Sequence, residues 1–231
     1  MRKIGLIVPS SNTTMEPEFN RVASGCATIH SARIRLQRVT PYELEAMEKE
    51  TSRAALELSD AAVDVICYGC TSGSLFRGLG HDRQIASKIE EETGIPAVVT
   101  AGAVIEALRA LGAKRLSVAT PYIREIEVLE KKFLEDNGFE ITSITSLGLA
   151  NNLDIGSQSP EIAYTLAKKA CTDTSDAVFI SCTNLKTIDV IGKTEVELNK
   201  AVVSSNTATI WKALRVLDIK NRYADYGRLL G

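Results

Sequence analysis

The feature that most constrains this chain is a repeat, because two similar stretches lie 112 residues apart. Each stretch begins with an aspartate, continues as a short apolar run typical of a buried strand, and closes on a Cys-Thr pair, at residues 64–71 and 176–183. The cysteines of the two pairs are Cys70 and Cys182. A repeat of about one hundred residues has the length of a domain and is too long for a solenoid unit, so it predicts two related domains.

The rest of the chain alternates between short apolar runs and helical patterns, which predicts parallel sheets covered by helices on both faces. We therefore predict an α/β fold of two similar Rossmann-like domains, each with a parallel four-stranded sheet. A pseudo-twofold axis would relate the domains and place the active site in the cleft between them. The first domain would span residues 1–103 and the second 104–231, with the last helix, about 206–218, packing back onto the first domain. Strands are expected at residues 3–9, 29–36, 63–70, 95–100, 114–121, 139–149, 176–182 and 201–204.

Three connections carry weaker patterns. Residues 41–62 predict one long helix, with Leu44 and Leu58 on its apolar side. Residues 187–198 predict a helix, and residues 151–156 predict a loop.

Composition excludes several classes of function. The formal net charge of −2 provides no basic excess to neutralise phosphates, so we expect no nucleic-acid partner. No apolar run approaches the length of a membrane span, and the run before Pro9 is short enough to be a strand and not a signal peptide. Five cysteines, an odd number in a chain large enough to build its own core, fit reduced thiols in a cytoplasmic protein.

The two repeated cysteines are the candidate catalytic groups. Ligands of open parallel sheets bind beyond the carboxyl ends of strands, and both Cys70 and Cys182 follow such ends. A free thiol has a pKa of about 8.5, and half ionisation at pH 7 requires about 2 kcal/mol of extra stabilisation of the thiolate. Backbone N–H groups of the following turns, at helix starts, are the expected source, so we predict a lowered thiol pKa at Cys70. One cysteine could then act as a thiolate while the other donates a proton.

The other cysteines have a simpler interpretation. Cys26, Cys67 and Cys171 are expected to fill space in the core, as buried free cysteines commonly do. Cys67 and Cys70 have the spacing of a metal or redox pair, but residues three apart in a strand point to opposite faces. The two histidines lack ligand spacing, so we expect no metal.

Neutral donors in the predicted turns complete the candidate site. They could form hydroxyl and amide cradles for carboxylate groups, although turn and cap residues have the same composition. These candidates are Ser11, Asn12, Ser72, Tyr122, Asn151 or Asn152, and Thr183.

Four stretches of the chain together resemble the maleate cis–trans isomerase group of the aspartate/glutamate racemase superfamily, to which arylmalonate decarboxylase is related. The resemblance covers essentially the whole chain and implies two Rossmann-like domains, a pseudo-twofold cleft and no cofactor. The stretches are Ile7 to Glu16, Cys70 to Ser74, Ser181 to Asn184, and Ser204 to Asn206.

The resemblance also implies roles for individual residues. Cys70 matches a nucleophile that adds to one alkene carbon of a cis-enedioate, and Cys182 matches the donor that protonates the neighbouring carbon. Rotation about the single bond and elimination then give the trans isomer. Arylmalonate decarboxylase lacks a cysteine at the first position. The carboxylate-binding positions match Asn12, Tyr122 and Asn152, and the anion-binding turns match Thr71, Ser72 and Thr183.

Three functions remain open at this point. The first is cis–trans isomerisation of maleate or a similar small dicarboxylate. The second is an amino-acid or hydantoin racemase, or a decarboxylase, of the same superfamily. The third is a non-catalytic module that binds small carboxylates. For each we expect a homodimer or higher homo-oligomer.

Overall fold

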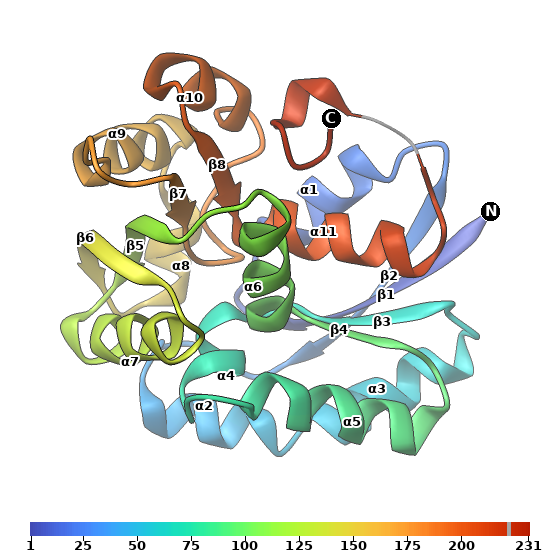
Figure 1. Ribbon diagram of the computed structural model, residues 1–231. Helices are drawn as coiled ribbons and strands as arrows, with labels where there is room; N and C mark the ends of the chain where they lie inside the picture. Colours follow the sequence, from blue (N-terminus) through green and yellow to red (C-terminus); the bar gives the residue numbers. More distant parts are fainter. Residues whose placement is uncertain (221–222) are drawn as a thin grey trace.

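The computed structural model, which describes residues 1–220 and 223–231, contains two four-stranded sheets whose strands are all parallel (Figure 1). The strand orders, β2-β1-β3-β4 and β6-β5-β7-β8, are the same arrangement used twice. The α/β prediction of two similar four-stranded halves is confirmed. The strands are β1 (Arg2–Pro9), β2 (Ala27–Ile34), β3 (Val65–Tyr68), β4 (Ala97–Val99), β5 (Arg115–Tyr122), β6 (Glu140–Leu149), β7 (Ala177–Ile180) and β8 (Ala201–Ser204).

Helices connect the strands and cover the sheets. None of the helices in the described part of the chain is long and apolar enough to cross a membrane. They are α1 (Met15–Val22), α2 (Pro41–Glu48), α3 (Thr51–Asp60), α4 (Thr71–Leu75), α5 (His81–Thr93), α6 (Thr100–Ala110), α7 (Arg124–Asp136), α8 (Asn152–Ser157), α9 (Pro160–Ala170), α10 (Ile191–Leu198), α11 (Ser205–Val216) and the short 3₁₀ helix η1 (Ala224–Tyr226).

The duplicated aspartates align the central strands of each sheet. The Asp64 carboxylate accepts a hydrogen bond from the Lys3 backbone N–H at 2.7 Å. In the second half, Asp176 accepts from the backbone N–H groups of Lys114 and Arg115, at 3.0 and 2.8 Å. An aspartate before β3 or β7 thereby binds the first residues of the neighbouring strand, which sets the height at which the cysteine-bearing strand ends.

The two halves share their interior. The last helix, α11, packs against α6, α1 and β3 (Figure 1). Each of the two apolar clusters draws side chains from both sheets, for example Ile4 and Leu116 in one and Ile7 and Val178 in the other. The division that we propose, between residues 103 and 104, falls within α6.

Three local predictions are wrong. The chain turns at Lys49 and Glu50, and the turn splits the expected long helix into α2 and α3, whose apolar faces pack separately on the core. Residues 187–190 form turns that carry backbone donors, so the helix begins only at Ile191. Residues 152–157 form the short helix α8, because the Asn151 side chain caps it by accepting from the N–H groups of Leu153 and Asp154.

Glu18, a buried carboxylate on α1, joins the two halves. Its oxygens accept hydrogen bonds from the backbone N–H groups of Thr187 and Ile188, at 2.7 and 3.1 Å, and from the Thr187 hydroxyl at 3.4 Å. The Asn206 amide, at the start of α11, donates to it at 2.7 Å. Burial raises the pKa of Glu18, and these donors, which satisfy both oxygens, act to lower it.

We predict that Glu18→Ala lowers the free energy of unfolding by about 3 kcal/mol or more, because it leaves several buried donors without an acceptor. Urea denaturation followed by circular dichroism measures the loss. Glu16→Ala is the matched control: this half-exposed carboxylate on the same helix pairs only with Arg33, and such pairs contribute about 0–1 kcal/mol. Equal losses in the two variants would contradict the assignment of Glu18 as the tie between the halves.

Candidate active site

The structure brings the two repeated cysteines together between the halves. Both cysteines follow a central strand of their sheet. Negative charge on either sulfur acts on the Tyr122 phenol, so both sulfurs lie near it. Cys70 is 5 % exposed and Cys182 is 4 % exposed. The charge of Cys70 also acts on Cys182, so the two thiols are neighbours, and both are buried.

Cys70 lies at the start of α4, where its sulfur accepts the Gly73 backbone N–H at 3.3 Å. The Ser72 hydroxyl lies 3.7 Å from the same sulfur. A Cβ at Gly73 would come within 3.0 Å of the sulfur and 2.5 Å of the Met47 methyl group, so only glycine lets this N–H approach. The Cys-Thr-Ser-Gly sequence thus builds a donor turn around one thiol.

Cys182 has a different backbone. Its φ is +90°, a strained value for a residue with a side chain, whereas Cys70 has an extended φ of −143°. The Ser205 hydroxyl accepts the Cys182 N–H at 3.0 Å and helps to hold this conformation. The Asn184 N–H points to the Cys182 sulfur at 3.4 Å, but no helix follows until Ile191, so the expected helix start is present only after Cys70.

Burial is the largest influence on the pKa of both thiols. Desolvation raises the pKa of Cys70, although the Gly73 N–H and the Ser72 hydroxyl act to lower it. Desolvation likewise raises the pKa of Cys182, to about 12, against the Tyr122 hydroxyl and the Asn184 N–H. The predicted lowering of the thiol pKa is therefore wrong for this structure, because a few neutral donors do not offset the loss of water.

The charged neighbours of the two thiols differ. Negative charge on Cys70 and on Glu130 disfavours a thiolate at Cys182. Repulsion between the two sulfurs is mutual and does not distinguish them, so the difference lies in Glu130, whose charge acts on Cys182. The surroundings therefore favour ionisation of Cys70 and retention of the proton by Cys182.

Hydroxyl and amide groups from both halves join around the cysteines. The Thr71 hydroxyl donates to Ser205 at 2.8 Å, and the Thr183 hydroxyl donates to the Gly69 carbonyl at 3.0 Å. The Asn12 amide donates to the Thr183 hydroxyl at 3.0 Å, and its oxygen accepts the N–H groups at the start of α1. The predicted donors Asn12, Thr71 and Thr183 are thus buried; Asn12 pairs with Thr183, and Thr71 pairs with Ser205.

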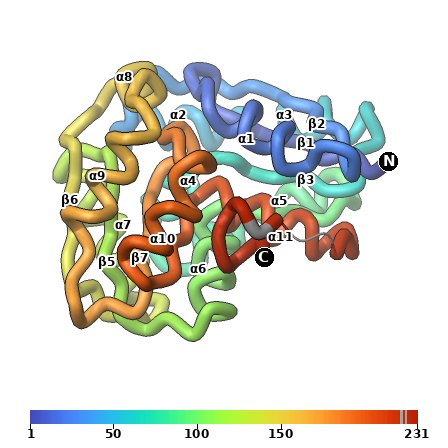
Figure 2. Tube along the Cα trace, turned by 90° about the horizontal axis from the view of Figure 1, so that it is seen from above, coloured from blue at the N-terminus to red at the C-terminus, as the bar shows by residue number. Residues whose placement is uncertain are grey.

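Asn152 and Asn151 have separate environments. Asn152 is buried and donates to the Ser11 hydroxyl at 2.8 Å, whereas Asn151 is exposed and caps α8. Their segment pairs with the chain between β2 and α2: the Val39 N–H donates to Ala150 at 2.7 Å, and the Asn152 N–H donates to Gln37 at 2.9 Å. This pairing brings α8 beside the first half (Figure 2).

Tyr122 ends β5 and is buried beside both cysteines. Its hydroxyl donates toward Cys182, and burial together with the negative charge on the sulfurs raises the pKa of the phenol well above its usual range. The phenol therefore stays protonated and acts as a donor.

Three further residues were not singled out from the sequence. Ser205 links Thr71 to the Cys182 backbone, Asn184 bridges the halves by accepting the Thr13 N–H at 2.9 Å, and Glu130 is a buried carboxyl near Cys182. The signal for Ser205 was its place just after the last strand, where ligands gather. In the described part of the chain, no three His, Cys, Asp or Glu side chains gather as metal ligands.

The fold consists of two pseudo-symmetric α/β halves, and each contributes one cysteine to a shared, polar and buried site. These features define the class as two-halved α/β proteins with paired cysteines. The model of the arylmalonate decarboxylase family matches residues 4–230, and the chain belongs to this family. A maleate isomerase of Geobacillus stearothermophilus is 34 % identical over 99 % of this chain and 96 % of its own length. The resemblance to maleate isomerases is thereby confirmed.

Two solved structures resemble this one closely. The maleate isomerase of Pseudomonas putida S16, a Cys-to-Ala variant with maleate, has a TM-score of 0.94 and 34 % identity, over 99 % of this chain and 97 % of that chain. A Cys-to-Ser variant of the maleate cis–trans isomerase of Nocardia farcinica, with a covalently bound succinylcysteine intermediate, has a TM-score of 0.94 and 32 % identity, over 99 % and 98 %.

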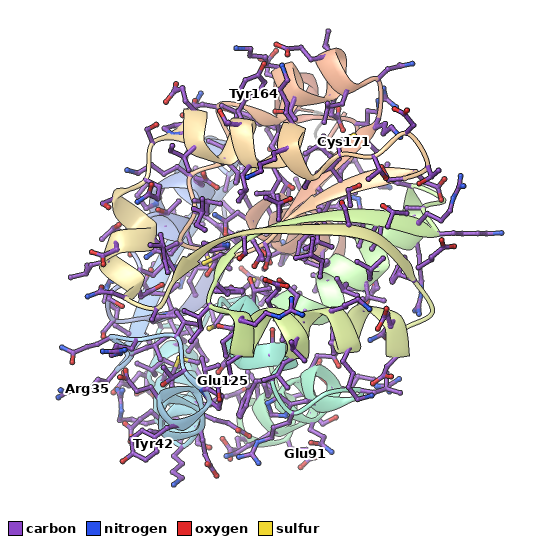
Figure 3. The ribbon with its side chains drawn as sticks, turned by 90° about the vertical axis from the view of Figure 1, so that its left-hand side faces the viewer. Arg35, Tyr42, Glu91, Glu125, Tyr164 and Cys171 are labelled. Atoms are coloured by element: carbon purple, nitrogen blue, oxygen red, sulfur yellow. The ribbon has the colours of Figure 1, made fainter. Side chains whose placement is uncertain are left out.

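We predict that iodoacetamide labels Cys26 and Cys171 before Cys70 and Cys182. The first two are half-buried, and Cys171 follows α9 (Figure 3), whereas the second two are enclosed and have raised pKa values. Digestion and mass spectrometry after short labelling times give the order. Fastest labelling at Cys70 would contradict the enclosed, protonated site.

Proposed function

We propose that this chain is a cis–trans isomerase that converts maleate to fumarate by covalent cysteine addition. The observation that carries the proposal is the presence of a cysteine on each half at the same enclosed site, because a thiolate and a thiol on opposite sides of an alkene suffice for reversible addition. The succinylcysteine of the Nocardia farcinica enzyme supports an addition product of this kind.

The proposed reaction has three steps. The Cys70 thiolate forms a C–S bond to one alkene carbon, and the electron pair of the π bond takes the proton of the Cys182 thiol at the other carbon. The product is succinyl-Cys70 with a thiolate at Cys182. After rotation about the new single bond, Cys182 removes the proton now aligned with it, the C–S bond breaks, and fumarate leaves with Cys70 again a thiolate.

The surroundings of the two cysteines support this assignment of roles. Two donors stabilise a thiolate at Cys70, as a nucleophile requires. The charge of Glu130 favours the thiol form of Cys182, as a proton donor requires, and Tyr122 and Asn184 can stabilise the thiolate that forms after donation. The acid and the nucleophile are thus distinguished by their neighbours.

We assign binding of the two carboxylates to Asn12, Tyr122 and Asn152, with the turns of Thr71, Ser72 and Thr183 as further donors. These groups are neutral, so hydrogen bonds and not a buried cation would hold the dianion. The Asn12 amide donates to the Thr183 hydroxyl and the Asn152 amide to the Ser11 hydroxyl. A bound carboxylate would replace these hydroxyls as the acceptors. Exchange of a hydroxyl for a charged acceptor strengthens each hydrogen bond and offsets part of the cost of removing the dianion from water.

Decarboxylation is the second candidate, because the matching family model is named for it. Proton delivery to a carbanion needs a single cysteine, so decarboxylation gives Cys70 no required role. The presence of Cys70 with its own donor turn favours isomerisation.

We also propose that the protein acts as a homodimer or higher homo-oligomer in the cytoplasm. Two large apolar side chains, Tyr42 and Val196, are more than four-fifths exposed at 83 % and 82 %, and Figure 3 places Tyr42 at the edge of the molecule. Burial of either side chain against a second copy would remove apolar surface from water. The thiols are free, as reduced cysteines of a cytoplasmic protein are.

The proposed function is tested by incubating the purified protein with maleate and following the alkene protons by NMR. Appearance of the fumarate signal supports the proposal. Loss of a carboxyl group from an arylmalonate, with maleate unaltered, would replace it by the second candidate.

We predict that the two cysteine variants fail differently. Cys70→Ala cannot form the C–S bond, so it should bind maleate and leave it unaltered. Cys182→Ala keeps the nucleophile but loses the acid, which lowers turnover by about 10²–10⁴-fold. Any adduct should lie on the peptide that contains Cys70, with a mass increase equal to maleic acid, as seen by mass spectrometry after a denaturing quench. An adduct on Cys182 in Cys70→Ala would reverse the roles, and full activity in either variant would exclude the two-cysteine mechanism.

A further inference from the structure

A buried carboxyl on α7 lies behind the second cysteine. Glu130 is 0 % exposed, and its Oε1 accepts a hydrogen bond from the hydroxyl of Ser181, the residue directly before Cys182. The Thr120 hydroxyl also acts on the carboxyl as a donor that lowers its pKa, although neither this hydroxyl nor Oε2 makes a hydrogen bond of normal geometry among the described residues. A buried carboxyl with so few donors is costly, so its presence calls for a physical reason.

The repeat supplies a matched comparison. Glu130 follows Glu18 by 112 residues, the offset of the two cysteines, and α7 occupies in the second half the place that α1 occupies in the first. Glu18 receives donors at both oxygens, two of them from Thr187. The residue 112 positions before Thr187 is Leu75 on α4, a helix that packs against α7, so the repeat offers Glu130 no counterpart of the Thr187 hydroxyl. Glu18 ties the two halves together, whereas the donors of Glu130, Ser181 and Thr120, both lie in its own half.

The location of Glu130 connects it to the thiols. α7 runs along β5 and β6 (Figure 3), beside the end of β7 where Ser181 and Cys182 follow. The charge of Glu130 acts on Cys182 and on Tyr122, whereas it is not among the causes that act on Cys70. Two cysteines in symmetric positions therefore have an asymmetric charge beside them.

We propose that Glu130 is a positioning residue whose carboxylate keeps Cys182 in the thiol form while Cys70 carries the negative charge. It touches neither the reacting carbon atoms nor the sulfur, and acts through its field and through the hydroxyl of Ser181. This inference rests on the proposed isomerase function for its role in turnover, but the effect on Cys182 exists without substrate.

The effect should depend on pH in the neutral range. Burial raises the pKa of Glu130 from its usual value near 4.5 to about 7, so the carboxyl is neutral below that pH and charged above it. Other ionisable groups also face this cluster: Glu127 on the same helix, Tyr122 at the end of β5, and Cys70 at the start of α4. Glu127 pairs with Arg124 and is the natural control for loss of a carboxylate from α7.

The test compares alkylation of Cys182 by iodoacetamide in wild type, Glu130→Gln and Glu127→Gln between about pH 5.5 and 8.5, with Cys70 and Cys182 peptides separated by mass spectrometry. At the acid end Glu130 is neutral in wild type, so Glu130→Gln should react at the same rate. Above about pH 7 the variant lacks the opposing charge, and Cys182 should react about tenfold faster, which corresponds to one pKa unit. Cys70 should change much less, and Glu127→Gln should keep the pH step of the Cys182 rate, moved to lower pH because the charge of Glu127 no longer raises the pKa of Glu130.

A rate ratio that is constant across pH would show that the substitution merely loosens packing, and equal changes at both cysteines would show a general opening of the site; either result would overturn the proposal. If Glu130→Gln does not fold, Ser181→Ala replaces it. That variant removes the hydrogen bond and moves the pH step of the Cys182 rate upward, and an unchanged step would contradict the proposal.

Activity gives a separate result. In the pH profile of kcat/KM for maleate, the alkaline fall of Glu130→Gln should begin at lower pH than that of wild type, because Cys182 loses its proton sooner. A shifted Cys182 rate in a protein that does not isomerise maleate would uphold Glu130 and reject the proposed function. Isomerisation of maleate with an unshifted Cys182 rate would uphold the proposed function and reject the role of Glu130.

Discussion

Two thiols are buried where formation of a thiolate costs free energy, and the chemistry of the site depends on how this cost differs between them. Burial raises the pKa of both Cys70 and Cys182. An enzyme that uses one thiolate and one thiol requires that the two costs differ. Each sulfur has one backbone N–H and one hydroxyl as donors, Gly73 and Ser72 at Cys70 and Asn184 and Tyr122 at Cys182, so the difference arises from the charge of Glu130 beside Cys182. Low dielectric strengthens each of these effects.

The duplicated fold explains why such a site forms at all. The same strand order in both halves, together with aspartates that set the height of β3 and β7, brings two equivalent cysteines to one place. Polar groups then cross between the halves and hold them in register, as Glu18 does toward Thr187 and Asn206. Departures from the repeat, such as the positive φ of Cys182, make the two thiols unequal.

The sheets and the repeat could be predicted from the sequence because they depend on local pattern and on a fixed spacing. The split between α2 and α3 could not, since Lys49 and Glu50 are ordinary helix formers and tertiary packing turns the chain there. The burial of the two thiols could not be predicted either, because it depends on how closely the two halves pack together. A usable signal did exist for Glu130: it shares the offset of 112 with Glu18 and lies on the same helix face as Ile126 and Phe133, which are buried.

The central claim is that Cys182 adds a solvent-derived proton to an alkene carbon while Cys70 holds the other carbon. Conversion of maleate in heavy water, followed by NMR of the product, tests this most directly. Cys182 must exchange its proton with water between turnovers. It then adds deuterium and, after rotation, removes the original hydrogen. The account predicts fumarate that carries deuterium on one carbon, and fumarate formed without any deuterium would contradict it.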